Sequence, residues 1–226
     1  KFSWVRVQRL NRMMYLVHIM NTDSKEDSLT LSLLQAIDKQ SNVTQRHLAD
    51  RLGVALGLAN SYLKRCVTKG LVKIEQAPAN RYLYYLTPKG FTEKSRLTAE
   101  YLSISFGFYR RASASCSEVF QQCINQNHNK IVLCGISELA EIAILRSREF
   151  NINIIGFIDR ESPEIEYLGS IVWKSSMQNP EYDAYIITSL QNPEAMLDYI
   201  NVEDGEKTIF VPAILGVQNL KEKKLE

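Results

Sequence analysis

The sequence predicts two domains of different fold class: an α+β domain of short helices with a two-stranded hairpin, followed by a small α/β domain with a parallel sheet. Apolar residues recur at helical spacing in the first part of the chain, and short apolar runs alternate with helical segments in the last part. Charge divides in the same way. Residues 1–130 contain 19 Lys and Arg against 9 Asp and Glu, a formal charge of +10, whereas residues 131–226 contain 8 against 16, a charge of −8.

The composition excludes several classes of protein. With 226 residues, 45% hydrophobic and 23% charged, the chain is long enough for two domains of a soluble globular protein. The apolar run at residues 13–20 is shorter than the roughly 20 residues that cross a bilayer, and no cleavage site follows it. Four cysteines without a C-x-x-C pair and three dispersed histidines favour neither disulfides nor a metal site. We expect a cytoplasmic protein without membrane contact.

The first domain is expected over residues 29–90, after an amino-terminal extension over residues 1–28. Leu29 to Lys39 form a first helix. Ser41, Asn42 and Thr44 are candidate caps for a second helix that ends at Gly53. One face of that second helix is apolar and carries Leu48, Ala49 and Leu52.

A third helix resumes after a turn at Gly53 and Val54, in "ALGLANSYLKRCVTKG". Its inward residues are Ala59, Tyr62, Leu63 and Cys66. Two short helices joined by a tight turn form a helix-turn-helix. Two strands follow, at about Leu71 to Glu75 and Tyr82 to Leu86, and predict a β-wing with Arg81 at its tip, where it could enter the minor groove of DNA.

The third helix is the candidate DNA-reading helix, because its face opposite the apolar residues is polar and basic. That face carries Gly57, Asn60, Ser61, Lys64 and, at its edge, Arg65. Amide and hydroxyl groups hydrogen-bond base edges, and cations reach guanine or phosphate. Gln45 and Arg46, in the first turn of the preceding helix, are better placed for the DNA backbone. The alternative is a helical hairpin with a solvated basic face.

The stretch "TQRHLADRLGVALGLANSYLKRCVTKGLVKIE" followed by "YLYYLTPKG" resembles the winged-helix domain of MarR-type transcriptional regulators, particularly the branch associated with exopolysaccharide gene clusters. The similarity covers residues 29–111. It implies a bacterial regulator that binds double-stranded DNA as a homodimer, on a palindromic or near-palindromic site. The wing "QAPANR" is short for this family.

Residues 91–129 are expected to be a helical connector that also forms the dimer interface. Apolar residues recur every three or four positions, which predicts one long helix or two shorter ones between Thr87 and about Asn125. Cys116 and Cys123 are seven residues apart and share a face. They are expected to be buried as small apolar residues, with a redox-linked disulfide between subunits as the alternative.

The second domain, residues 130–218, is predicted to be Rossmann-like, with a tail over residues 219–226. The expected strands are residues 131–134, 153–158, 171–173, 184–188 and 208–211. In such folds, ligands bind beyond the carboxyl ends of the parallel strands. The candidate ligand-binding residues at those ends are Gly135, Ser137, Glu138, Asp159, Arg160, Thr188 and Ser189.

The stretch "KIVLCGISELAEIAIL" predicts a strand, a glycine turn and a helix, with Gly135, Ser137 and Ala140 at the positions of a G-x-G-x-x-G fingerprint. Ser137 can donate a hydroxyl to an anion, but Glu138 would repel a phosphate. Asp159 follows at about the separation expected of a carboxylate that binds a ribose diol. The ordinary alternative is the first strand and helix of any α/β domain.

The pair "VLCGISELAEIAI" and "INIIGFIDRESPEIEYLGSIVW" is similar to small Rossmann-like domains at the front of sugar acyltransferases and nucleotide-sugar-modifying enzymes of polysaccharide synthesis. Arg160 replaces the second acidic residue of that family. The resemblance implies a nucleotide, a nucleotide-sugar or a related metabolite as effector. No catalytic set is recognisable, so we expect a regulator with a sensor domain and not an enzyme. The alternatives are a nucleotide-sugar-modifying enzyme with an autoregulatory DNA-binding module, and a regulator whose second domain only docks protein partners.

Overall fold

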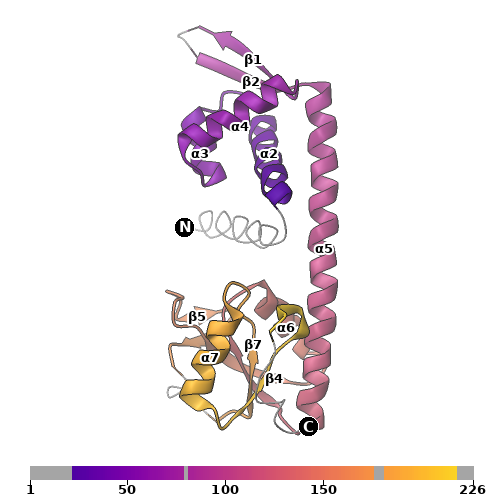
Figure 1. Cartoon of the computed structure of the whole chain (residues 1–226), viewed down its shortest axis with the longest axis vertical. Helices are drawn as coiled ribbons and strands as arrows, with labels where there is room; N and C mark the ends of the chain where they lie inside the picture. The colour runs from indigo at the N-terminus through magenta and orange to yellow at the C-terminus, as the bar shows by residue number, and fades with distance from the viewer. Residues whose placement is uncertain (1–21, 79–80, 176–180, 218–226) are drawn as a thin grey trace. The chain divides into compact units, whose positions relative to one another are not determined.

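The computed structural model of the chain describes residues 22–78, 81–175 and 181–217. The chain divides into two compact units, Lys1–Phe106 and Gly107–Glu226 (Figure 1). The predicted tail, residues 219–226, and most of the predicted extension, residues 1–28, lie outside the described residues.

From residue 22 on, the amino-terminal unit has the predicted order of three helices, a hairpin and a further helix. Its elements are α2 (Thr22–Lys39), α3 (Gln45–Leu52), α4 (Leu56–Thr68), β1 (Val72–Ala77), β2 (Arg81–Leu86) and the first part of α5 (Pro88–Asn125). The two strands pair antiparallel from Val72 with Leu86 to Ala77 with Arg81. Figure 1 shows the hairpin reaching beyond the helices as a wing.

Helix α2 begins at Thr22, so it overlaps the predicted extension of residues 1–28 and the boundary lies nearer the amino terminus than expected. Its first turns are polar and carry no apolar period. Glu26 instead contacts Arg65 through an ion pair, at 2.6 Å between Oε1 and Nη2. Hydrophobic periodicity does not detect a helix segment of this kind.

The helix-turn-helix forms as predicted. Thr44 caps α3 by accepting a hydrogen bond from the His47 amide at 3.1 Å. Gly53 ends the helix in the left-handed region, with a φ of 63°. The predicted face of α3 is buried, as are Ala59, Leu63 and Cys66 of α4, together with Leu33 and Leu34 of α2. Tyr62, which was also predicted to face inward, is only partly buried.

Helix α5 starts in close contact with the end of α4. Thr87 Oγ1 accepts a hydrogen bond from the Gly90 amide at 3.0 Å and donates one to the Gly70 carbonyl at 2.6 Å. A Cβ atom on Gly90 would overlap the carbonyl oxygen of Leu71. The glycine of "TPKG" is therefore required for the approach of α5 to the wing.

The carboxy-terminal unit contains a six-stranded sheet, which confirms the predicted α/β class. The strand order is β5-β6-β4-β3-β7-β8, and only β5 pairs antiparallel with its neighbour. The strands are β3 (Lys130–Cys134), β4 (Asn153–Ile158), β5 (Glu166–Tyr167), β6 (Ser170–Trp173), β7 (Ala184–Ile187) and β8 (Thr208–Phe210). The short strand β5 was not predicted. It joins β6 through Leu168 and Gly169, which have φ values of 51° and 79°.

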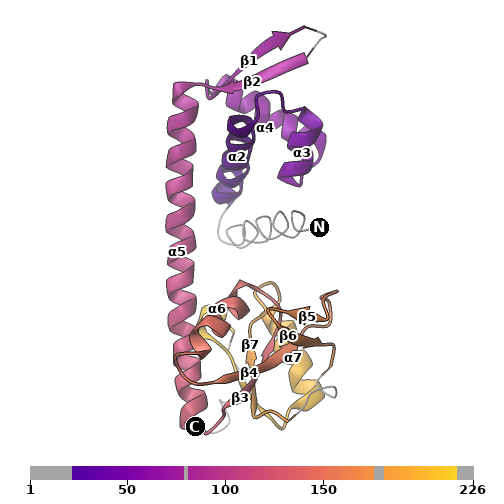
Figure 2. The ribbon, with the colours of Figure 1, turned by 180° about the vertical axis from the view of Figure 1, so that it is seen from behind.

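Helices cover both faces of this sheet (Figure 1; Figure 2). One face packs against α6 (Glu138–Ser147) and the last turns of α5, and the other packs against α7 (Pro193–Asp204). The short 3-10 helix η2 (Ala213–Leu215) follows β8. Alternation along β3 sends Ile131 and Leu133 to the first face and Val132 and Cys134 to the second.

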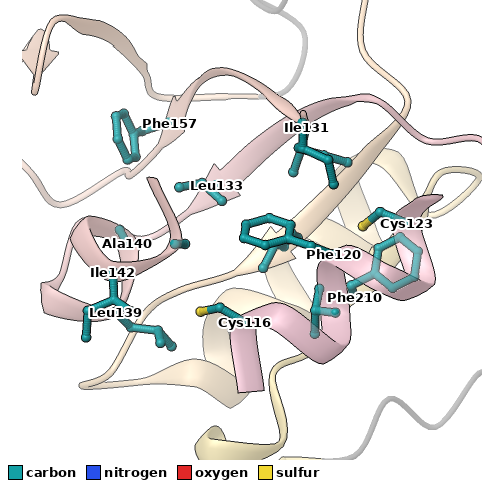
Figure 3. Packing of buried hydrophobic residues seen from close by; sticks show 14 of the residues in the cluster. Cys116, Phe120, Cys123, Ile131, Leu133, Leu139, Ala140, Ile142, Phe157 and Phe210 are labelled. Atoms are coloured by element: carbon teal, nitrogen blue, oxygen red, sulfur yellow. The ribbon is translucent and has the colours of Figure 1, made fainter. Parts of the chain in front are cut away.

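The predicted connector is a single helix, and its last turns belong to the core of the carboxy-terminal unit. Figure 3 shows Cys116, Phe120 and Cys123 of α5 facing Ile131 and Leu133 of β3. Burial raises the pKa of the Cys116 and Cys123 thiols to about 12. Both cysteines are packed as apolar residues, so the expectation of burial is confirmed.

Candidate nucleic-acid interface and candidate ligand site

Helix α4 presents a polar face away from its buried residues. Gly57, Ser61 and Lys64 of the predicted DNA-reading set are exposed and lie on this face at spacings of three and four. Thr68, which the sequence reasoning missed, continues the same face and is exposed. Ser61 Oγ donates to the Gly57 carbonyl at 3.0 Å, which leaves its lone pairs free to accept.

Asn60 lies at the border of the polar face, not at its centre. Its side chain is partly buried, and its Oδ1 atom is fully buried with no hydrogen-bond partner among the described residues. A carboxamide that reads adenine needs both its oxygen and its nitrogen. Asn60 would therefore have to change rotamer to act as the base-reading residue that the sequence predicts.

Arg65 contacts α2 and not the centre of the polar face. Its guanidinium lies 2.6 Å from Glu26 Oε1 and 5.8 Å from the centroid of the Tyr62 ring. Lys69 Nζ approaches the same Glu26 oxygen at 3.7 Å. The sequence placed Arg65 at the edge of the reading face, and it gave no signal of this acidic partner, because the two residues are far apart in the chain.

The residues predicted to contact the DNA backbone lie in the first turn of α3. Gln45 and Arg46 are both exposed, and Gln45 Nε2 donates to the Tyr84 hydroxyl at 3.3 Å. Arg81 is the first residue of β2 and pairs with Ala77 near the tip of the wing. The sequence reasoning missed the wing tyrosines Tyr82 and Tyr85, which are exposed on either side of the less exposed Leu83 and the buried Tyr84.

Helix α4 begins without a side-chain cap. Ala55 occupies the N-cap position, and no acidic residue lies in the first turn. Leu56 and Leu58 in that turn are exposed apolar residues. The Leu58 and Ala59 amides donate to the Ala55 carbonyl, at 2.9 and 3.1 Å. The first turn of α4 therefore has no side-chain cap and no negative charge that would oppose an approaching phosphate.

At the carboxyl edge of the sheet, the glycine turn after β3 packs against the end of β7. Gly135 has a φ of 102°, and a Cβ atom there would lie 2.6 Å from the backbone of Ser189. The Thr188 hydroxyl donates to the Gly135 carbonyl at 2.6 Å. The glycine is thus needed for contact with the protein's own backbone.

Ser137 is the N-cap of α6. Its hydroxyl accepts from the Leu139 and Ala140 amides, at 3.1 and 3.4 Å, and donates to the Thr188 carbonyl at 2.5 Å. Ser137 and Thr188 are both buried. The hydroxyl that we expected to meet an anion is already fully bonded within the protein.

Asp159 also bonds to the protein backbone. Its Oδ2 atom accepts from the Ile136 amide at 2.9 Å, and its Oδ1 atom accepts from the Glu161 and Ser162 amides at 3.1 and 3.0 Å. This carboxylate, which we expected to bind a ribose, instead holds the glycine turn. We call the set of residues 135–137, Asp159, Thr188 and Ser189 the interlocked turn.

The two remaining candidates differ in position. Glu138 lies in the first turn of α6 and is partly buried. Arg160 is exposed, and its guanidinium lies 4.8 Å from the centroid of the Tyr199 ring of α7, beyond the interlocked turn.

In the described parts of the chain, no three His, Cys, Asp or Glu residues are grouped to hold a metal ion. No helix in those parts is long and apolar enough to span a membrane.

Replacing Asp159 with asparagine is expected to destabilise the carboxy-terminal unit by about 1–3 kcal/mol, because the amide cannot accept as strongly from three backbone donors. Urea denaturation followed by circular dichroism measures the loss. Glu161→Gln is the matched control, because its exposed side chain caps no amide in the described structure and its free energy of unfolding should change by less than about 0.5 kcal/mol. Equal effects of the two substitutions would contradict a holding role for Asp159.

Comparison with known protein families agrees with the fold predicted for the first domain. Residues 26–73, from α2 to the start of the wing, match the family of winged helix-turn-helix DNA-binding domains. The amino-terminal domain is a winged helix-turn-helix. No curated protein sequence matches the chain.

Solved structures similar to the chain include regulators and an enzyme. The PcaV transcriptional regulator from Streptomyces coelicolor is 21% identical, over 54% of this chain and 89% of that one, with a TM-score of 0.37. MepR, a transcription regulator of the Staphylococcus aureus efflux pump MepA, is 18% identical over 48% and 82%, with a TM-score of 0.34. Human N-acetylserotonin methyltransferase, in complex with SAM, is 11% identical over 93% and 79%, with a TM-score of 0.37. Scores this low establish no shared function.

Proposed function

We propose that the chain is a DNA-binding transcription regulator of the MarR type, in which α4 enters the major groove. The observation that carries this proposal is the exposed polar face of α4, with Gly57, Ser61 and Lys64 opposite a buried apolar face, in a domain of the winged helix-turn-helix family. A small, a hydroxylic and a cationic residue on one face allow close approach, base contact and phosphate contact.

The charge distribution supports the same function. Residues 1–130 carry a formal charge of +10, and cations that neutralise DNA phosphates release condensed counterions. Arg46 and Lys64 are exposed and have no ion-pair partner among the described residues, so they are available for this role. Binding to any duplex should therefore weaken steeply as salt rises.

The proposed DNA-bound form is a homodimer, because two half-sites about 34 Å apart need two helix-turn-helix units. Phe91, Leu102 and Phe106 support association through α5. All three are exposed aromatic or aliphatic residues, and their spacing places them within one stripe of the helix.

Replacing Lys64 with alanine is expected to weaken binding to specific and random duplexes alike, and to reduce the slope of log K against log salt by about one. Fluorescence anisotropy with labelled duplexes between low and moderate salt measures both quantities. Arg148→Ala is the control, because it removes the same charge from an exposed position of the carboxy-terminal unit. Equal loss for both variants would show that Lys64 acts only through net charge.

The proposed target genes are those of cell-surface polysaccharide synthesis, and the proposed effector is a nucleotide, a nucleotide-sugar or a related metabolite. Support comes from the resemblances of residues 29–111 and 130–216 to proteins of that context. Binding at the carboxyl edge would require the ligand to use groups beside the interlocked turn, such as the exposed Arg160, or to displace Asp159 from its amides.

A second candidate role for the carboxy-terminal unit is the docking of a protein partner. The interlocked turn favours the docking role. Its polar groups, which would otherwise recognise a nucleotide, form hydrogen bonds with one another. Thermal unfolding with NAD(H), UDP-sugars and acyl-CoA separates the two roles. A rise in Tm with one compound supports the sensor, no rise with any supports docking, and turnover of a nucleotide-sugar would support an enzyme.

A further inference from the structure

One carboxylate of α2 faces two cations of the DNA-reading helix. Glu26 Oε1 lies 2.6 Å from Arg65 Nη2 and 3.7 Å from Lys69 Nζ. Arg65 borders the polar face of α4, and Lys69, the C-cap residue, lies further round the helix toward α2, because each step of four residues turns by about 40°.

Resting on the proposed DNA-binding function, we propose that Glu26 competes with DNA phosphate for Arg65 and Lys69. The carboxylate and a phosphate offer the same chemistry to a guanidinium, namely paired anionic oxygens. In free protein, Glu26 occupies these donors. In the complex, the two cations turn to the DNA backbone, and Glu26 is released to solvent.

The exposure of the three side chains allows this exchange. Arg65 and Lys69 are 53% and 57% exposed, and Glu26 is 35% exposed. An exposed ion pair contributes little to stability, so a phosphate can replace the carboxylate at small cost. Glu26 therefore lowers the affinity of the protein for any DNA sequence. Binding then depends more on the contact of Ser61 with base edges.

Asp27 provides the matched control, because it has the same charge at the next position and a different partner. Its Oδ2 atom lies 4.0 Å from Arg96 Nη2 of α5 and contacts neither cation of α4 in the described structure. Glu26→Gln and Asp27→Asn each raise the net charge by one and keep the shape of the side chain. Only Glu26→Gln frees Arg65 and Lys69.

The experiment measures binding of the full chain to a random-sequence duplex across a salt series. We expect Glu26→Gln to raise affinity roughly two- to fivefold at low salt, and to steepen the salt slope by about one. Asp27→Asn should change affinity less than twofold. Equal gains for the two variants would overturn the inference. Absence of binding by the wild-type chain would overturn the proposed function as well.

A double-mutant cycle tests the partner. Arg65→Ala should reduce affinity only slightly in the wild-type background, because Glu26 already occupies this side chain, and it should abolish the gain in the Glu26→Gln background. Equal losses in both backgrounds would mean that Arg65 contacts DNA regardless of Glu26. Thermal unfolding of each variant checks folding, and Glu26→Asp, which keeps the charge, should bind like the wild type.

Discussion

Replacing Phe120 with alanine is expected to destabilise the carboxy-terminal unit by about 3–5 kcal/mol. Phe120 is fully buried, and it packs with Ile131 and Leu133 of β3 beneath the sheet (Figure 3). Its loss leaves a cavity that the surrounding helix and strands can only partly fill. Urea denaturation followed by Trp173 fluorescence reports on this unit alone once the other tryptophan is removed as Trp4→Phe.

The control for Phe120 lies one turn further along the same helix. Ile124 is exposed, so Ile124→Ala should cost about 1 kcal/mol or less. If Phe120→Ala cost as little as Ile124→Ala, the last turns of α5 would be a connector, as the sequence suggested, and not a part of the core.

Replacing Gly90 with alanine is expected to destabilise the amino-terminal unit by about 3 kcal/mol or more. The added methyl group would overlap the Leu71 carbonyl oxygen, which is backbone and cannot turn aside. Either α5 moves away from the wing or the cap at Thr87 breaks. Amide signals of α3 and α4, followed by NMR through a urea titration, measure the stability of this unit separately.

Gly107 is the matched position in the same helix. An added Cβ there meets only the end of the Arg111 side chain, at 3.5 Å. Gly107→Ala should therefore stabilise the carboxy-terminal unit, to which Gly107 belongs, by about 0.5–1 kcal/mol, as measured by urea denaturation followed by Trp173 fluorescence in the Trp4→Phe background. The two substitutions are chemically identical and should have opposite signs. Destabilisation by both would mean that overlap with Leu71 is not the cause of the effect at position 90.

The elements fixed by local chemistry could be predicted from the sequence. Thr44 and Gly53 define the ends of α3 through a hydroxyl cap and a left-handed residue, and both signals depend only on neighbouring positions. The strands of the second unit are short apolar runs that differ in period from the helices. For this reason the class of both domains followed from the pattern.

The features fixed by long-range side-chain contacts could not be predicted. The first turns of α2 are polar, and the partner of Glu26 in these turns, Arg65, lies far along the chain. Asp159 has the sequence spacing of a ribose-binding carboxylate, yet this carboxylate accepts a hydrogen bond from the Ile136 amide of the protein itself. Spacing along the chain places a carboxylate near a site, but it does not show which hydrogen-bond donor that carboxylate will bind.

The interlocked turn has a consequence for the cooperativity of the carboxy-terminal unit. Gly135, Asp159 and Thr188 follow three adjacent parallel strands, and their hydrogen bonds tie the ends of those strands together. At this edge, one strand cannot separate from the sheet alone, because its separation would also break hydrogen bonds to the ends of the neighbouring strands. Hydrogen exchange of the Ile136 and Leu139 amides should therefore occur only through opening of the whole sheet, so that the turn and the strands behave as one foldon.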